Sequence, residues 1–113
     1  PDPSDPWSVA AFRTWKILKQ STDARGRPLE IVRLPEPLRP RIGSVDFVAS
    51  YVNYYVCNDA VIAAQFGDDR TDAEARATLK RLYAGREIVI LNVDPIGEVG
   101  GGIHCATQQQ PAA

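Results

Sequence analysis

The chain has 113 residues, of which 44% are hydrophobic and 24% are charged, and these values are ordinary for one folded domain. Thirteen basic and fourteen acidic side chains leave a formal net charge of -1 at pH 7, so the composition indicates neither a nucleic-acid partner nor an anionic membrane surface. No apolar run reaches the roughly 18 residues of a membrane-spanning helix, and no basic-then-apolar leader opens the chain, which favours a cytoplasmic location.

A helix is predicted over residues 5–21, because residues 4–6 (Ser-Asp-Pro) combine a side-chain cap with a proline that the first turn tolerates. Its apolar stripe consists of Trp7, Ala10, Ala11, Trp15 and Leu18. A turn is expected at residues 23–27. A short strand pattern follows at residues 29–34 and ends at Pro35, which has no amide hydrogen for a sheet.

Residues 36–44 are rich in proline and arginine and are expected to form a loop over the surface or over the mouth of a site. Aromatic and β-branched residues then dominate residues 47–56, and a second apolar run covers residues 60–64. Asn58 and Asp59 separate the two runs. This pattern predicts two strands joined by a tight turn.

A second helix is predicted from Thr71, which forms a capping-box pattern with Glu74. Gly85 is its expected left-handed stop, and its expected buried residues are Ala75, Leu79, Leu82 and Tyr83. The nearly continuous apolar run at residues 87–93 is typical of a strand covered on both faces. The order strand, strand, helix, strand predicts an α/β fold with a ββαβ unit over about residues 28–107.

Asp68, Asp69 and Asp94 could be imagined as clamps for a substrate, but each has a structural explanation that is favoured. Asp68 and Asp69 stand just before the second helix, where a turn or helix-end role is expected. Asp94 precedes a proline and is likewise expected in a turn. Asn53 and the tyrosines around it in the predicted strand could approach a site, but alternation between core and surface explains them without a catalytic role.

Cys57 and Cys105 are the only cysteines, and their distance in the sequence lacks the paired spacing of a zinc site. We therefore expect no metal, and a disulfide between them is poorly motivated in the cytosol. Cys57 is interpreted as a core residue. The sequence also lacks methionine, even at its first position. Two explanations for the absence of a first methionine are removal of the initiator methionine and a chain that is part of a longer protein.

A glycine-rich loop, ending in residues 100–102, leads directly into His104 and Cys105. Glycines let the backbone approach a ligand closely, and a cysteine that follows them can be a nucleophile if its thiolate is stabilised. Spacing alone leaves open, and even favours, a buried and inert cysteine. His104 is the only histidine and the nearest candidate for a catalytic base. If residues 103–107 are extended, however, its side chain points away from that of Cys105, so a structural role is expected for it. No lysine, serine or threonine follows at the spacing of a phosphate-binding loop.

Four stretches of this chain resemble the C-terminal region of agmatine deiminases and the related bacterial peptidylarginine deiminases. They are SYVNYY at 50–55, QFGD at 65–68, GR at 85–86 and GGGIHCATQQQP at 100–111. The last stretch is the most specific, and the similarity runs from about residue 23 to the end. The resemblance implies a pentein, the guanidine-modifying fold, in which five ββαβ blades form an α/β propeller around a central site. Residues 1–113 would then be a single C-terminal portion of a deiminase domain.

The resemblance also implies the reaction, agmatine plus water giving N-carbamoylputrescine and ammonia, without a cofactor. Cys105 occupies the position of the nucleophile, and Gly101 and Gly102 would frame the substrate by backbone contacts. The family takes its catalytic histidine and aspartates from earlier blades, so the chain alone is expected to be inactive. Its partners would be a small guanidine substrate, either agmatine or an arginine side chain, and the rest of the parent enzyme or a second copy.

Two other functions remain open from the sequence. One is a stand-alone α/β module that keeps the fold but only binds or assembles. The other is a thiol redox protein, which needs a second cysteine close to Cys105.

Overall fold

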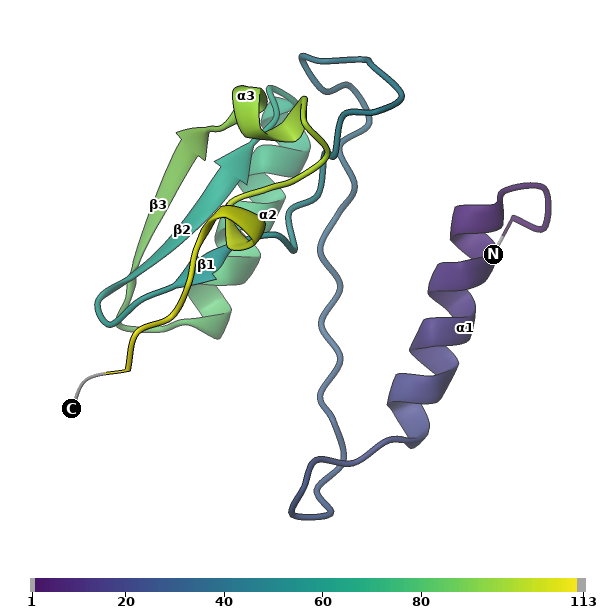
Figure 1. The fold of residues 1–113 in the computed structure, drawn as a ribbon. Coiled ribbons are helices and arrows are strands. Elements are labelled where there is room, and N and C mark those ends of the chain that lie inside the picture. Colours follow the sequence, from purple (N-terminus) through teal and green to yellow (C-terminus); the bar gives the residue numbers. More distant parts are fainter. Residues whose placement is uncertain (1, 112–113) are drawn as a thin grey trace. The chain divides into compact units, whose positions relative to one another are not determined.

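The computed structural model describes residues 2–111 (Figure 1). The chain divides into two compact units, the first ending at Arg33 and the second beginning at Leu34. Each unit is described by itself below. Among the described residues, no helix combines the length and apolar character that crossing a bilayer requires.

The first unit contains α1 (Pro6–Gln20), which confirms the predicted helix. Asp5 caps it by accepting hydrogen bonds from the backbone N–H groups of Trp7 (3.0 Å) and Ser8 (3.1 Å). None of the residues of α1 is buried, and the side chain of Trp7 is 84% exposed. The apolar stripe is therefore present, but its residues are not buried by the described residues of the chain.

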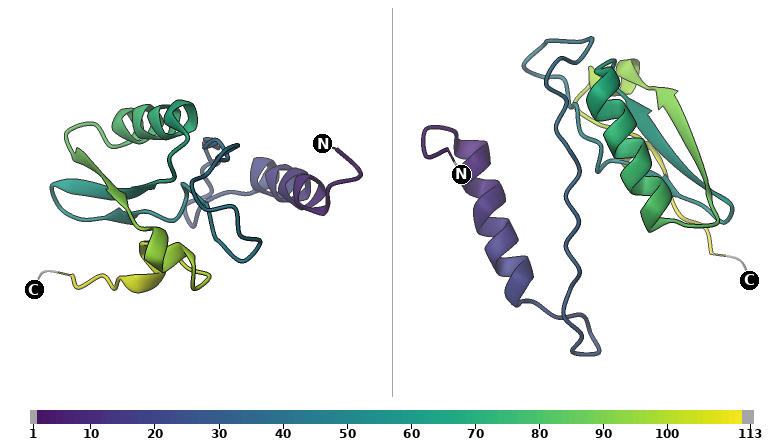
Figure 2. Two further views of the ribbon diagram at one scale, coloured as in Figure 1. Left: turned by 90° about the horizontal axis from the view of Figure 1, so that it is seen from above. Right: turned by 180° about the vertical axis from the view of Figure 1, so that it is seen from behind.

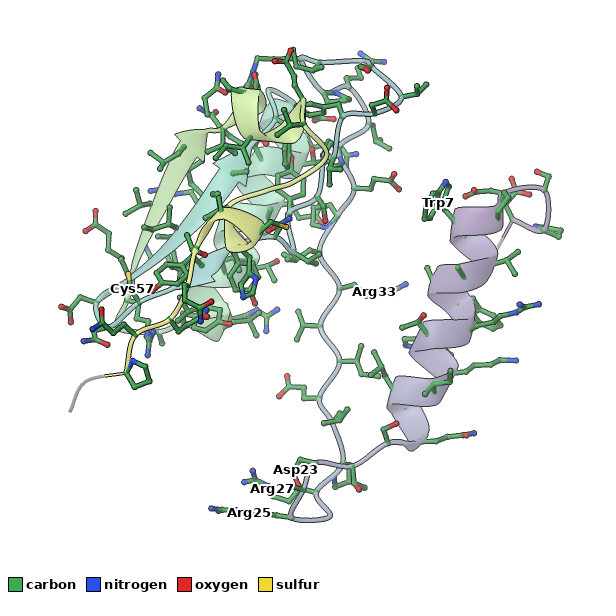
Figure 3. The ribbon with its side chains drawn as sticks, viewed as in Figure 1. Trp7, Asp23, Arg25, Arg27, Arg33 and Cys57 are labelled. Carbon is green, nitrogen blue, oxygen red and sulfur yellow. The ribbon has the colours of Figure 1, made fainter. Side chains whose placement is uncertain are left out.

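The predicted turn after α1 is confirmed, and Figure 3 shows Asp23, Arg25 and Arg27 together there. Asp23 forms an ion pair of 2.7 Å with Arg27, and Gly26 adopts a left-handed φ of 75°. Thr22 and Pro28 form an isolated antiparallel bridge. The strand predicted at residues 29–34 is wrong, because within the described residues this extended segment forms no ladder with a neighbouring strand.

The second unit is built on a three-stranded sheet in the order β1-β2-β3 (Figure 1). Its strands are β1 (Tyr55–Val56), β2 (Ala60–Gln65) and β3 (Glu87–Asn92). β1 runs antiparallel to β2, and β3 runs parallel to β2 after the crossover helix α2 (Asp69–Leu82). The predicted ββαβ order is confirmed. β1 is shorter than predicted, because residues 47–54 form turns and irregular backbone instead.

Both faces of the sheet carry apolar side chains, and Figure 2 shows α2 on one face and the segment from α3 onward on the other. Val61 packs with Leu79 of α2 in one buried cluster. Ala64 packs with Tyr51 and with Ile103 in a second cluster. The C-terminal segment is thus anchored on the sheet through Ile103.

The start of α2 differs from the prediction. Asp68 is its N-cap and accepts a hydrogen bond of 3.3 Å from the backbone N–H of Thr71. Thr71 itself lies in the first turn, is 1% exposed, and shares a hydrogen bond of 2.9 Å with the hydroxyl of Tyr51. The predicted capping box between Thr71 and Glu74 is wrong, because an aspartate one turn earlier already caps the helix. The helix-end role expected for Asp68 is confirmed.

Two predictions of burial are also corrected, although Ala75 and Leu79 are buried as predicted. Leu82, the last residue of α2, is 39% exposed. Leu91 of β3 is 44% exposed, so β3 is not covered on both faces by the described residues. Gly85 has a φ of 90°, which confirms the predicted left-handed stop.

The proline-rich loop is held on the ends of β2 and β3 by Arg41. Its guanidinium donates to both carboxylate oxygens of Asp94 (2.9 and 3.0 Å) and to the carbonyl oxygen of Gln65 (2.8 Å). Its backbone N–H donates to the carbonyl oxygen of Phe66 at 2.7 Å. Asp94 also begins the short helix α3 (Asp94–Gly97), so it has an ion-pairing role beyond the expected turn.

Candidate functional site

The candidate site lies where the chain leaves the glycine-rich loop. Gly100 has a φ of 82°, a left-handed conformation that suits glycine. Ile103 then anchors the segment in the core with 6% exposure. A single 3₁₀ turn, η1 (His104–Ala106), follows it. The segment is therefore not extended, which was the condition under which the side chains of His104 and Cys105 were expected on opposite faces.

Cys105 lies in η1, and its thiol is free and exposed. The alternative of a buried, inert cysteine is therefore wrong for this fold. Ile103, two residues before Cys105, is buried in a core cluster and anchors the start of the turn. The exposed thiol therefore lies next to a well-packed residue. A thiol in this setting is open to a ligand from solvent.

Asn53 contacts the cysteine from a segment 52 residues earlier in the chain. Its Nδ2 donates a hydrogen bond of 3.3 Å to Sγ of Cys105. Its Oδ1 accepts a hydrogen bond of 2.8 Å from the backbone N–H of His104, and lies 3.8 Å from Sγ. One amide therefore engages two successive residues of η1. From the sequence, Asn53 could approach a site but was given no catalytic role, and its polar side chain in a run of aromatic and β-branched residues was the available signal.

These contacts lower the pKa of the Cys105 thiol below its ordinary value. The hydrogen bond from the Asn53 amide is the main cause, and the backbone of Gly102 adds to it. A hydrogen bond donated to sulfur favours the thiolate, which is the nucleophilic form of cysteine. The lowered thiol pKa is one feature that a nucleophilic cysteine requires.

The two glycines predicted to frame a substrate differ in their surroundings. Gly102 is buried, and a Cβ on it would collide with the side-chain amide of Asn53. A Cβ on Gly101 would meet Cβ of Cys105 at 3.7 Å and Ile96 at 3.9 Å, which is ordinary contact. Gly102 is therefore required by the packing of Asn53, and substrate framing by both glycines stays a prediction.

His104 is exposed, and among residues 2–111 no hydrogen bond joins its imidazole to Cys105. Its backbone N–H is the group that contacts Asn53. The structural role expected for His104 fits this arrangement, although the reason is a 3₁₀ turn and not an extended strand. No group of three or more His, Cys, Asp or Glu side chains that could hold a metal ion occurs in the described part of the chain.

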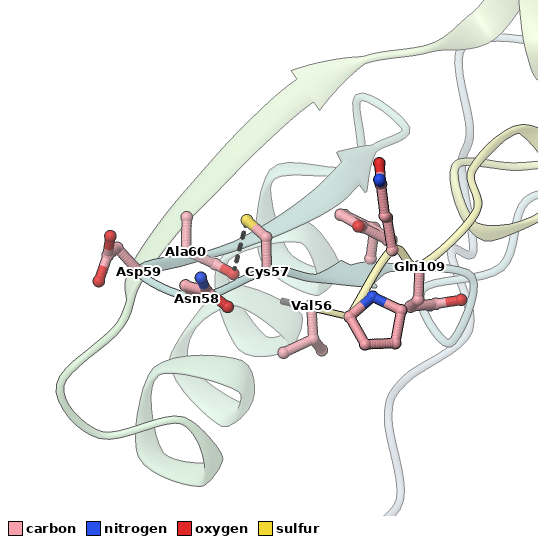
Figure 4. A pocket seen from close by; sticks show the side chains of 9 residues that line it. Val56, Cys57, Asn58, Asp59, Ala60 and Gln109 are labelled. Carbon is pink, nitrogen blue, oxygen red and sulfur yellow. Dashed lines mark hydrogen bonds between the residues drawn. The ribbon is translucent and has the colours of Figure 1, made fainter. Parts of the chain in front are cut away.

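Cys57 lies elsewhere, at the end of β1, and is also a free thiol (Figures 3 and 4). Its Sγ donates to the carbonyl oxygen of Ala60 at 3.3 Å. It is half-buried in the turn between β1 and β2, so its interpretation as a core residue is wrong. The turn and residues 109–111 line an open depression of about 540 Å³ (Figure 4), and Cys105 does not line it.

Comparison with known proteins gives a consistent result. The family model described as "Porphyromonas-type peptidyl-arginine deiminase" matches residues 1–111. A putative agmatine deiminase of Streptomyces avermitilis is 38% identical over 111 residues, covering 98% of this chain and 32% of that protein. The agmatine deiminase of Medicago truncatula is 36% identical over 132 residues, and the match covers 98% of this chain and 35% of that protein.

Two solved structures have the same α/β arrangement of sheet and helix. Agmatine deiminase of Enterococcus faecalis has a TM-score of 0.83 at 31% identity, covering 97% of this chain and 34% of that chain. A putative arginine deiminase from Porphyromonas gingivalis has a TM-score of 0.86 at 28% identity, and the match covers 98% of this chain and 32% of that chain.

The present chain spans about a third of the length of these relatives. Its similarity to them extends over nearly all of its residues, and the family model matches residues 1–111. The chain therefore belongs to the Porphyromonas-type peptidyl-arginine deiminase family and matches the C-terminal third of its relatives.

Proposed function

We propose that this chain is the C-terminal portion of a guanidine deiminase in which Cys105 is the nucleophile. The observation that carries the proposal is the exposed thiol of Cys105, held in hydrogen-bonding contact with the amide of Asn53. Membership in a family whose relatives are named agmatine deiminase supports the reaction class. Agmatine is the proposed substrate, and an arginine side chain is the alternative.

The proposed reaction has two steps. The thiolate of Cys105 attacks the guanidinium carbon, a carbon–sulfur bond forms, and the carbon–nitrogen bond to one amino group breaks as that nitrogen takes a proton and leaves as ammonia. Water then attacks the same carbon, and the carbon–sulfur bond breaks. Loss of both protons of the added water gives the ureido product N-carbamoylputrescine and restores the thiolate, and one of these protons balances the proton that the leaving amine took up.

The remaining catalytic groups would come from other parts of the parent enzyme. A guanidinium is a delocalised cation, so carboxylates are needed to hold its nitrogens and a general acid/base is needed to protonate ammonia and activate water. Among residues 2–111, the side chain that hydrogen-bonds to Cys105 is the neutral amide of Asn53. A catalytic histidine and aspartates in earlier blades would complete the set.

The proposed setting is one blade of a five-bladed α/β propeller, with residues 1–113 as a single C-terminal portion of the deiminase domain. The ββαβ order of the second unit supports this assignment, since that order defines a blade. β3 is an edge strand of the described sheet and carries the 44%-exposed Leu91. An adjacent blade or a second copy of the chain would cover such an edge.

The proposal is tested by ammonia release from agmatine and from a peptidylarginine in the complete natural protein that contains this chain. Cys105→Ala is expected to reduce turnover roughly a thousandfold or more, because among residues 2–111 no other thiol lies beside Asn53. Cys57→Ala is the matched control and is expected to retain turnover. Undiminished turnover in Cys105→Ala would remove Cys105 from the mechanism, and activity on neither guanidine would end the proposal.

A further inference from the structure

We propose that Phe47 is a positioning residue for the glycine-rich loop that leads to Cys105. Phe47 belongs to residues 41–48, a segment that contacts both ends of α3 and that we name the clasp. α3 leads directly into residues 98–102, so a segment that holds α3 also holds the start of the glycine-rich loop. The contacts of the clasp carry this inference, and its effect on turnover rests on the proposed function of Cys105.

α3 is too short to keep its position by itself. It has four residues. Forming the first turn of a helix costs more conformational freedom than its few hydrogen bonds return, so such a helix depends on tertiary contacts. The glycines at positions 100, 101 and 102 add backbone freedom to the loop that follows. The path by which the chain reaches Cys105 therefore depends on the contacts that hold α3.

Arg41 of the clasp holds the start of α3. Its guanidinium donates to both carboxylate oxygens of Asp94, the first residue of α3, and to the carbonyl oxygen of Gln65, the last residue of β2. A Cβ on Gly67 would overlap the Arg41 side chain, so Arg41 also packs closely against the chain beyond β2. Arg41 thus connects the start of α3 to the end of the sheet.

Phe47 and Val48 of the clasp hold the end of α3. The carbonyl oxygen of Gly97 accepts from the backbone N–H of Val48 at 3.3 Å and from that of Gly100 at 3.1 Å. The ring of Phe47 lies where a Cβ on Gly97 would be. Gly97 does not have a left-handed φ, so it is the ring and not the backbone conformation that excludes a side chain there.

The ring of Phe47 also connects Gly97 to the core. It meets the ring of Phe66 edge to face, with centroids 6.0 Å apart and an interplanar angle of 87°. Phe66 is 3% exposed and belongs to the buried cluster that contains Ile103, and Phe47 packs against the same cluster. The glycine-rich loop between Gly97 and Ile103 is therefore held at both of its ends by one set of packed side chains.

A short series of contacts links α3 to the residue that carries the thiol. A Cβ on Gly101 would lie 3.9 Å from the side chain of Ile96 in α3 and 3.7 Å from Cβ of Cys105, which is ordinary van der Waals contact. The backbone of Gly101 thus lies between α3 and Cys105. A displacement of α3 is expected to move the glycine-rich loop and with it the backbone contact of Gly102 that favours the thiolate of Cys105.

The test adds one methyl group at the contact between Gly97 and Phe47. In the complete natural protein that contains this chain, Gly97→Ala is expected to speed amide hydrogen exchange in residues 98–104 about fivefold or more, as measured by peptide mass spectrometry. The methyl group would displace the Phe47 ring and release the loop. Gly43→Ala is the matched control, because Gly43 lies in the same clasp with open space around its Cβ position and without a left-handed φ. Equal exchange in the two variants would overturn the proposal.

A double variant separates this contact from a general loss of stability. Phe47→Ala removes the ring, so adding Gly97→Ala to it is expected to change the exchange of residues 98–104 no further. Two effects that simply add would mean that Gly97 and Phe47 act independently, which would overturn the proposal. The rate of alkylation of Cys57 by iodoacetamide, in the turn between β1 and β2, is the check that the sheet is intact in each variant.

Kinetics in the complete natural protein distinguish this inference from the proposed function. Gly97→Ala is expected to lower kcat for agmatine about threefold or more and to slow alkylation of Cys105 at pH 7 by a similar factor, because the thiolate is the reactive form in both. Gly43→Ala is expected to leave both rates unchanged. Faster exchange in Gly97→Ala with unaltered kcat and alkylation would overturn the positioning role of Phe47 and leave the deiminase function standing. Slower alkylation in a protein that releases no ammonia would overturn the deiminase function and support the role of Phe47.

Discussion

Tyr51 has a buried aromatic ring whose hydroxyl has two partners. The residue is 2% exposed, and its hydroxyl lies 2.9 Å from Oγ1 of Thr71 and donates to Oδ1 of Asp72 at 2.6 Å. Burial, together with the bond to Asp72, raises the pKa of Tyr51, so it stays protonated as a donor. Asp72 also accepts from the backbone N–H of Phe66 (2.8 Å), which ties this network to the end of β2.

We predict that Tyr51→Phe lowers the free energy of unfolding by about 1–3 kcal/mol, because Asp72 and Thr71 lose a buried partner while the ring still packs. Urea denaturation followed by circular dichroism measures the change. Tyr54→Phe is the matched control, since its hydroxyl has one partner, Tyr83 at 3.0 Å, and its loss should cost less. Equal stability of Tyr51→Phe and the unaltered chain would contradict the prediction.

At this scale the sequence predicts residue types better than contacts. Cys105 stands out because glycines precede it, and this signal is local. Asn53 donates a hydrogen bond to Sγ of Cys105 although the two residues are 52 positions apart in the sequence. No local sequence pattern predicts such a contact. The backbone N–H of His104 donates to Asn53 in a 3₁₀ turn, and this tertiary contact also has no signal in the local sequence.

Helices and strands with strong periodicity were predictable, whereas their ends depended on tertiary contacts. β2 and α2 follow their apolar patterns. Asp68, by contrast, caps α2 while also accepting from the backbone N–H groups of Leu38 (3.0 Å) and Arg39 (3.1 Å). A loop far away in sequence therefore shares the helix cap, and the pattern at Thr71 could not reveal it.

The ion pair between Arg41 and Asp94 connects the proline-rich loop to the end of the sheet. The Arg41 guanidinium holds the pKa of the Asp94 carboxyl below its usual value, mainly through its hydrogen bonds. A carboxyl with a lowered pKa stabilises the fold above its unfolded pKa, about 3.9, and this stabilisation is lost as pH falls through the lower folded pKa.

We predict that Asp94→Asn lowers the free energy of unfolding by about 1 kcal/mol between pH 5 and 8, because the pair is only partly shielded from water. The difference from the unaltered chain should begin to shrink below about pH 4 and should close once the pH has fallen through the lowered pKa of folded Asp94. Urea midpoints across this pH range measure it. Asp46→Asn, at an exposed loop residue, is the control. A difference that persists unchanged at the lowest pH would contradict the ionic explanation.

For the whole molecule, the sequence indicated the family and the ββαβ order, and the comparisons and the sheet confirm both. Residues 29–34 do not form the expected strand, and β3 is not covered on both faces. Each of these features needs neighbouring segments that the described residues do not supply. The site also lacks neighbouring groups: Cys105 has a hydrogen-bonding amide, but among residues 2–111 no carboxylate or imidazole forms a hydrogen bond with it.

We therefore predict that purified residues 1–113 release no measurable ammonia from agmatine, although Cys105 remains open to alkylation. Thiolate formation needs only the local contact with Asn53, whereas holding a guanidinium and moving its protons needs carboxylates and a base. A coupled ammonia assay measures turnover, with the complete natural protein as the positive control and alkylation of Cys105 as the check that the site is formed. Ammonia release by residues 1–113 that disappears in Cys105→Ala would show that this chain holds a full catalytic set.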